Sequence, residues 1–117
     1  MSISFKNLIV WKKSMDLAVE IYKVSEQFPK NETYGIISQI RRCAISIPSN
    51  IAEGRQRGSK KDMTRFFLIA YGSAGELETQ IELSKRLGFA NDIDFSKSDS
   101  LLNEVQKILT VMIRNMK

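Results

Sequence analysis

Apolar side chains recur every three or four residues along most of this 117-residue chain, and this period constrains the fold more than any other feature. Such a row lies on one face of an α-helix, whereas the residues of a strand would alternate with a period of two. Four amphipathic helices are predicted, over residues 8–28, 32–53, 59–88 and 95–116. Because the connections between them are short, we expect one all-α domain, an up-down-up-down four-helix bundle.

Residues typical of helix ends lie at the boundaries of these segments. Asn31 and Ser59 are expected to cap the second and third helices, because their side-chain oxygens can accept a free N–H of the first turn. Gly54 and Gly88 are expected to end the same two helices. Pro48 lies inside the second segment, where proline removes one backbone donor, so we expect a kink there, with a break as the alternative.

The first segment has more apolar surface than a small isolated bundle needs. Its apolar and small residues form two rows: Leu8, Trp11, Met15, Ala18, Tyr22 and Ser25, and then Val10, Leu17, Ile21, Val24 and Phe28. Together with Val19, these rows cover roughly 220° of the helix, whereas a core-facing stripe needs just over ~100°. The excess predicts a second buried surface, and self-association is our hypothesis for it.

The amino-acid composition excludes most kinds of catalytic site and metal site. There is no histidine, which is the commonest metal ligand and the usual general base near neutral pH. Cys43 is expected to be a small buried hydrophobe, with a thiol activated by Arg42 as the alternative. No phosphate-binding GxxxxGK[ST] loop or dinucleotide-binding GxGxxG motif occurs. We therefore predict no enzymatic activity, no cofactor and no metal, and we interpret Glu76, Glu78 and Glu82 as surface or interface charges.

The sequence also bears on location. The longest apolar runs, such as residues 66–71, are far shorter than the ~20 residues of a membrane-spanning helix. A lone cysteine cannot form an intramolecular disulfide, and no secretory signal pattern opens the chain. A reducing cytoplasm is the expected location, and no membrane partner is expected.

The net charge of +5 is concentrated in one stretch. Residues 1–40 carry a net +1 and residues 66–117 a net −1, so residues 41–65 carry the remaining +5. The basic residues there, opposed only by Glu53 and Asp62, are Arg41, Arg42, Arg55, Arg57, Lys60, Lys61 and Arg65. A local positive field attracts polyanions, and arginine can donate two hydrogen bonds to a phosphate. These seven residues are candidate contacts for RNA or DNA phosphates. A solvated, solubilising face is the alternative.

Polar residues form a second face of the second helix at a spacing close to seven. They are Gln39, Arg42, Ser46, Asn50 and Glu53. This face lies roughly 200° from the predicted core row between Ile37 and Ile51. It is either a plain polar face or half of a hydrogen-bonded network with the third helix that fixes helix register and subunit geometry. The members of that network would be Ser46, Asn50, Glu53, Tyr71, Ser73 and Glu76.

Several motifs occur in an order that resembles one protein family. They are Trp11, Phe28-Pro29, Tyr34-Gly35, Gln39-Ile-Arg-Arg42, the stretch 46–54, Ala70-Tyr-Gly-Ser73 and Glu76-Leu-Glu-Thr-Gln80. Over nearly the whole chain they are similar to the bacterial four-helix-bundle family that includes proteins encoded in intervening sequences of 23S rRNA genes. That family is similar to the accessory proteins of diversity-generating retroelements. The resemblance implies a ring-like homopentamer without known enzymatic activity. For the retroelement relatives it implies binding to nucleic acid and to a reverse transcriptase.

Two functions are consistent with these observations. The first is an oligomeric module that repeats the basic segment and binds RNA or DNA phosphates with a steep dependence on salt. Base specificity is not predicted, because the basic segment contains no aromatic residue before Phe66, which is expected in the core. The second is a scaffold for protein–protein interactions, in which the basic face binds an acidic protein or keeps the oligomer in solution.

Overall fold

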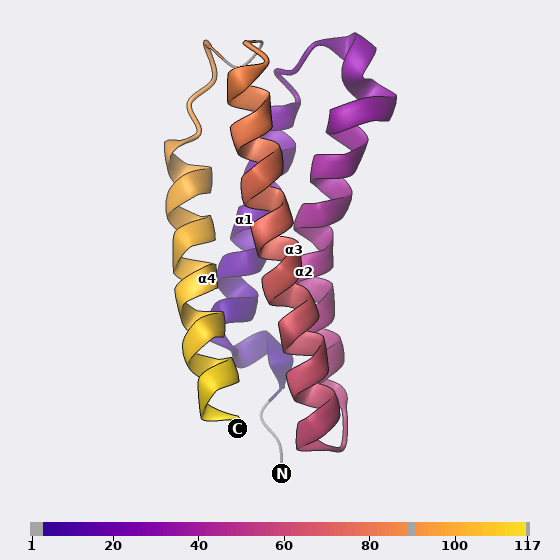
Figure 1. Cartoon of the computed structure of the whole chain (residues 1–117), viewed down its shortest axis with the longest axis vertical. Coiled ribbons are helices and arrows are strands. Elements are labelled where there is room, and N and C mark those ends of the chain that lie inside the picture. Colours follow the sequence, from indigo (N-terminus) through magenta and orange to yellow (C-terminus); the bar gives the residue numbers. More distant parts are fainter. Residues whose placement is uncertain (1–3, 89–90, 117) are drawn as a thin grey trace.

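The structure, a computed structural model, describes residues 4–88 and 91–116. This part of the chain forms four α-helices: α1 (Ile9–Ser25), α2 (Ser38–Gln56), α3 (Lys60–Arg86) and α4 (Ser96–Asn115). They run alternately up and down in a bundle of 47 × 23 × 21 Å (Figure 1). The short turns are η1 (Phe5–Asn7), η2 (Lys30–Glu32) and η3 (Thr33–Ile37). No strand occurs among the described residues, so the predicted all-α four-helix bundle is confirmed. None of the helices in residues 4–88 and 91–116 combines the length and apolar character that crossing a bilayer requires.

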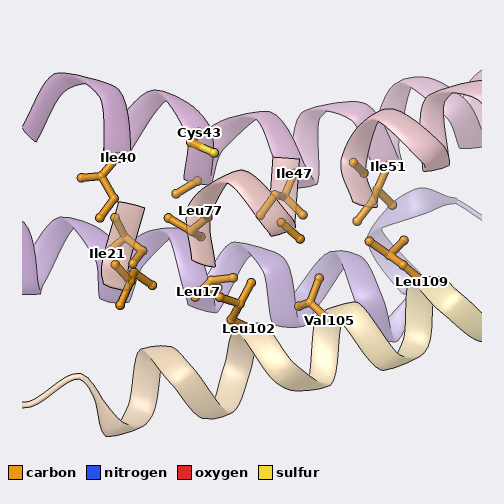
Figure 2. Packing of buried hydrophobic residues seen from close by; sticks show 14 of the residues in the cluster. Leu17, Ile21, Ile40, Cys43, Ile47, Ile51, Leu77, Leu102, Val105 and Leu109 are labelled. Atoms are coloured by element: carbon orange, nitrogen blue, oxygen red, sulfur yellow. The ribbon is translucent and has the colours of Figure 1, made fainter. Parts of the chain in front are cut away.

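Each helix turns one row of apolar side chains toward the bundle axis. Figure 2 shows these rows meeting, with residues such as Leu17 of α1, Ile47 of α2, Leu77 of α3 and Leu109 of α4. All four of these side chains are fully buried, and burying a side chain of this size stabilises the fold by about 1.5–3 kcal/mol. The helical period therefore accounts for one continuous core.

The second of the two predicted rows of α1 faces this core, whereas the first lies partly at its edge and partly outside it. Leu17 and Ile21 of the second row are completely buried. In the first row Met15 and Tyr22 each remain 41% exposed, and Val19 beside them is 53% exposed. The excess apolar arc of this helix therefore lies outside the core of the protomer, at the surface that the sequence assigned to self-association.

The second helix begins later than the sequence indicates. The pattern places its start near residue 32 with Asn31 as the cap, whereas α2 begins at Ser38. Residues before it form the short turns η2 and η3, and inside η3 Gly35 has non-helical backbone angles (φ −107°, ψ −115°). Glycine lacks the Cβ that restricts other residues to the common regions, so the chain can change direction there.

Pro48 and Gly54 both lie within α2. The helix continues through Pro48 as far as Gln56, so the alternative of a break at the proline is wrong. Gly54 does not end the helix. It is buried against α3, where an added Cβ would lie 2.9 Å from Cδ1 of Phe67. The glycine is therefore explained by the close approach of two helices.

The predicted ends of the third helix agree with the structure. The hydroxyl of Ser59 accepts a hydrogen bond from the backbone N–H of Asp62 over 3.1 Å, so the expected cap is confirmed. Helix α3 ends at Arg86, and Gly88 follows with a φ of 85°. This left-handed conformation strongly favours glycine, which explains why a glycine follows the helix.

Candidate nucleic-acid interface

The seven predicted phosphate contacts fall in two places. Arg41 and Arg42 lie in the first half of α2, and the other five surround the turn between α2 and α3 (Figure 1). The helical rise separates the two groups by roughly 20 Å at 1.5 Å per residue. We call the second group the basic end of the bundle. It consists of Arg55, Arg57, Lys60, Lys61 and Arg65.

Arg41 is engaged in contacts within the protomer. Its Nε donates to Oγ of Ser25 over 2.8 Å, and its Nη2 donates to the carbonyl of Tyr22 over 3.3 Å. Nη2 also forms an ion pair with Glu26 over 3.2 Å, and the guanidinium lies 4.5 Å from the centre of the Tyr22 ring. A phosphate would have to compete with all of these contacts. Arg41 therefore serves to tie α2 to the end of α1.

The basic end is more accessible. Lys60, Lys61 and Arg65 are exposed at the start of α3, and none of them forms an ion pair with a carboxylate in the described part of the chain. Arg57 pairs with Glu53 over 2.9 Å, but both side chains are more than two-fifths exposed. Exposed ion pairs of this kind contribute only about 0–1 kcal/mol, so an incoming phosphate can compete with Glu53.

Phe66 lies at this basic end, whereas the helical period predicts it in the core. Only its neighbour Phe67 is fully buried, because consecutive residues of a helix point about 100° apart. The guanidinium carbons of Arg57 and Arg65 lie 4.7 Å and 4.6 Å from the centre of the Phe66 ring. The ring therefore holds two arginines in place by cation–π attraction.

A cleft of about 1000 Å³ opens beside these arginines. One wall is Phe5 of η1, and the others include Arg55, Arg57, Lys60 and Met63. No pattern in the sequence identifies Phe5 or Met63 as part of a site. Phe5 precedes the first periodic segment, so only the packing of η1 against α1 and α2 brings it to the α2–α3 turn.

Four of the six residues of the predicted polar network line a groove of about 570 Å³ between α2 and α3, namely Ser46, Asn50, Ser73 and Glu76. Two of them bond to their own helix: Oγ of Ser46 donates to the carbonyl of Cys43, and Nδ2 of Asn50 donates to the carbonyl of Ser46, each over 2.7 Å. The connection between the helices comes from Cys43. Its thiol donates to the carbonyl of Ser73 over 3.1 Å and to Oε1 of Glu76 over 3.3 Å. This polar groove thus contains a link between the two helices through Cys43, which was not among the predicted network residues.

The remaining members of the predicted network lie elsewhere or face outward. Glu53 pairs with Arg57 at the basic end, and Tyr71 is 43% exposed. Gln80, one turn beyond Glu76, also lines the polar groove, and its Oε1 is buried with no hydrogen-bond partner among the described residues.

Cys43 is a buried residue, as predicted, with only 4% of its surface exposed. Burial raises the pKa of its thiol to about 12, and the hydrogen bond to the Glu76 carboxylate and the negative charge of that group add to the rise. The thiol therefore remains protonated near neutral pH and acts as a hydrogen-bond donor. The alternative of a nucleophile activated by Arg42 is not supported.

The family profile of the 23S rRNA-intervening sequence proteins matches residues 6–111. The chain belongs to this family. A crystal structure of a protein with unknown function from the S23 ribosomal protein family of Bacteroides thetaiotaomicron is similar to it, with 32% sequence identity and a TM-score of 0.75. The match covers 90% of this chain and 98% of the other. No curated protein sequence matches this chain.

Membership of the 23S rRNA-intervening sequence protein family agrees with the resemblance carried by the sequence motifs. The family name refers to 23S rRNA, whereas the similar crystal structure is of a protein with unknown function. Neither comparison assigns a role to a residue of the basic end.

Proposed function

We propose that the protein is a non-enzymatic, self-associating module that binds the phosphate backbone of RNA or DNA and acts as an accessory or scaffold factor. The observation that carries this proposal is the basic end, where five cationic side chains gather at the α2–α3 turn. Neutralising phosphates with lysine and arginine releases condensed counterions, which supplies most of the affinity of backbone binding. The family name refers to 23S rRNA and is consistent with an RNA-related role.

The geometry of the arginines supports phosphate binding. Arg57, at the end of α2, and Arg65, in α3, share the Phe66 ring, with their guanidinium carbons 4.7 Å and 4.6 Å from its centre. A guanidinium held against an aromatic ring loses less conformational freedom when it binds, and its planar donors suit two phosphate oxygens. This arrangement favours contact with a polyanion over a purely solubilising role.

Self-association is supported by a second groove, between α1 and α2. This apolar groove of about 550 Å³ is lined by residues such as Met15, Val19, Tyr22 and Ile45. Each of these four side chains is at least 41% exposed in the protomer. An oligomer that covered them would repeat the basic end once per subunit, and weak phosphate contacts would then add through multivalency.

The apolar groove also favours the second candidate function, a scaffold for protein–protein interactions. Exposed apolar surface of this kind marks protein contact sites in general. A scaffold would use the grooves for assembly and the basic end for an acidic protein. It would not need to bind nucleic acid.

Two measurements separate the two functions. The affinity of the protein for RNA and for DNA is measured by titration at several salt concentrations, and the mass of the oligomer is measured by light scattering. The test variant changes Arg55, Arg57, Lys60 and Lys61 to Ser. A matched control changes Lys12, Lys30, Arg86 and Lys107 to Ser, so that both variants lower the formal net charge from +5 to +1. Circular dichroism establishes that both fold.

The native chain and the control are expected to form an oligomer and bind with similar affinity. The test variant is expected to lose affinity. Its slope of log K against log salt should also fall by roughly 0.7–0.9 for each phosphate contact removed. An oligomer that binds neither RNA nor DNA, or binding that both variants weaken equally, would contradict the proposal and favour the protein scaffold.

A further inference from the structure

The cleft beside the basic end combines positive charge with apolar walls. Arg55, Arg57 and Lys60 line it together with Phe5 and Met63, and no carboxylate is among the described residues of its lining. Its volume of about 1000 Å³ lies at the upper end of the ~300–1,000 Å³ typical of small-molecule sites. A simple phosphate-binding surface needs no such hollow and no aromatic wall.

Phe5 is held at the edge of this cleft by local structure. Oγ of Ser4 accepts a hydrogen bond from the backbone N–H of Lys6 over 3.2 Å and so caps the turn η1. The Phe5 ring meets Trp11 edge to face, with 5.4 Å between ring centres and 66° between their planes. The side chain is only partly buried, so part of the ring remains available in the cleft.

We infer that this cleft takes an unpaired nucleotide of a bound strand, with its phosphate at the cations and its base against Phe5 and Met63. The inference rests on the proposed function and names the form of nucleic acid that the basic end prefers. Single-stranded nucleic acids bind where a positive groove follows the backbone and aromatic side chains stack on the bases. Both features meet in this cleft.

A duplex cannot satisfy the same site. Its bases are stacked and paired, so a convex ridge of phosphates reaches the protein first, and a base enters a cleft only after leaving the stack at a cost of a few kcal/mol. Every base has an aromatic face, so stacking on Phe5 tolerates different sequences. The cleft therefore selects unpaired strands without selecting a base sequence.

The first test compares a 12-nucleotide unpaired RNA, the DNA of the same sequence and a 12-base-pair RNA duplex by fluorescence anisotropy. The variant is Phe5→Leu. The matched control is Tyr34→Leu, because Tyr34 is 98% exposed and lies in η3, at the other end of the bundle (Figure 1). The ratio of RNA to DNA affinity identifies which strand is the ligand.

The native chain and Tyr34→Leu are expected to bind an unpaired strand at least about fivefold more tightly than the duplex, the lower limit of stacking one base. Phe5→Leu is expected to lose this preference but keep its duplex affinity. Equal affinity of the native chain for strand and duplex, or an unchanged preference in Phe5→Leu, would overturn the inference. If the four-residue variant of the basic end still lost binding, the proposed function would stand. A native chain that bound neither form would overturn both.

A second test needs no variant, so it holds even if Phe5→Leu fails to fold. The native chain is crosslinked by light to an unpaired RNA that contains 4-thiouridine, and the attached peptides are identified by mass spectrometry. Attachment at Phe5 or Met63 is the expected result. Attachment confined to residues outside the cleft would overturn the inference.

Discussion

Two grooves of nearly equal volume flank α2, and their linings are opposite in character. The groove toward α1, of about 550 Å³, is apolar, and Lys23 is the one charged side chain among its described lining residues. The groove toward α3, of about 570 Å³, contains Arg42, Glu76 and several amides and hydroxyls. Ile45 lines the first and Ser46 the second, so one step of about 100° along the helix separates the two.

This difference determines what each groove can require of a partner. Apolar surface is non-directional, so the α1–α2 groove needs shape and the exclusion of water. The polar groove needs matched donors and acceptors, because a buried polar atom without a partner is costly. Inside the protomer Cys43 supplies one such match by donating to Glu76, while Oε1 of Gln80 has no partner among the described residues.

The largest expected effect concerns the thiol of the polar groove. The rise in the pKa of Cys43 from 9.0 to about 12 lowers its thiolate fraction about a thousandfold at pH 8. Iodoacetamide should therefore alkylate the native chain at least about tenfold more slowly than the chain unfolded in guanidinium chloride, because a more basic thiolate offsets part of its lower population. Glu76→Gln should raise the native rate but leave it well below the unfolded rate, because burial is the main cause of the shift. Equal alkylation rates of the native and the unfolded chain would show that the groove does not protect the Cys43 thiol.

The same shift has a consequence for stability. The unfolded chain releases the thiol proton near pH 9.0 and the folded chain near 12, so the folded state binds more protons between these values. The free energy of unfolding should therefore be unaffected by this group below pH 9 and fall as the pH rises toward 12. Denaturant titrations of the native chain and Cys43→Ala at pH 7 and pH 10 measure the difference.

A further effect separates the core from the apolar groove. Ile47 is fully buried, whereas Ile45, two residues earlier on α2, is 44% exposed. Ile47→Ala should lower the free energy of unfolding by about 2–5 kcal/mol, because it leaves a cavity. Ile45→Ala should cost far less in a dilute monomer and instead lower the light-scattering mass if subunits cover this groove. Equal losses of stability, with no change in mass, would contradict the distinction.

The smallest effect tests why α2 and α3 approach closely. In Gly54→Ala the new Cβ would meet the buried Phe67 ring, which should lower the free energy of unfolding by about 1–3 kcal/mol. The higher helix preference of alanine should offset ~0.5–1 kcal/mol of this loss. Gly75→Ala is the matched control. It lies inside α3 with nothing within 4 Å of the new Cβ, and should stabilise the fold by about 0.5–1 kcal/mol. Thermal unfolding of both variants checks the sign, and a stabilising Gly54→Ala would contradict the packing argument.

The sequence by itself determined the helical class, the bundle and the ends of the third helix, whereas it misplaced the start and the end of the second. The period of the apolar residues and the Ser59 cap depend on neighbours within a few turns of one helix, which is why they can be read in order along the chain. The net positive charge of residues 41–65 also follows directly from the sequence, because it is the number of basic residues minus the number of acidic ones.

Only the tertiary structure decided which of these residues meet. It turned Phe66 outward between two arginines, occupied Arg41 with α1, placed Gly54 against Phe67 and brought Phe5 to the α2–α3 turn. Each of these contacts joins separate elements, and its geometry depends on how neighbouring helices pack and how each is rotated about its axis. A helical period defines that rotation only to within about one residue, or 100°, which is the difference between the core and the surface.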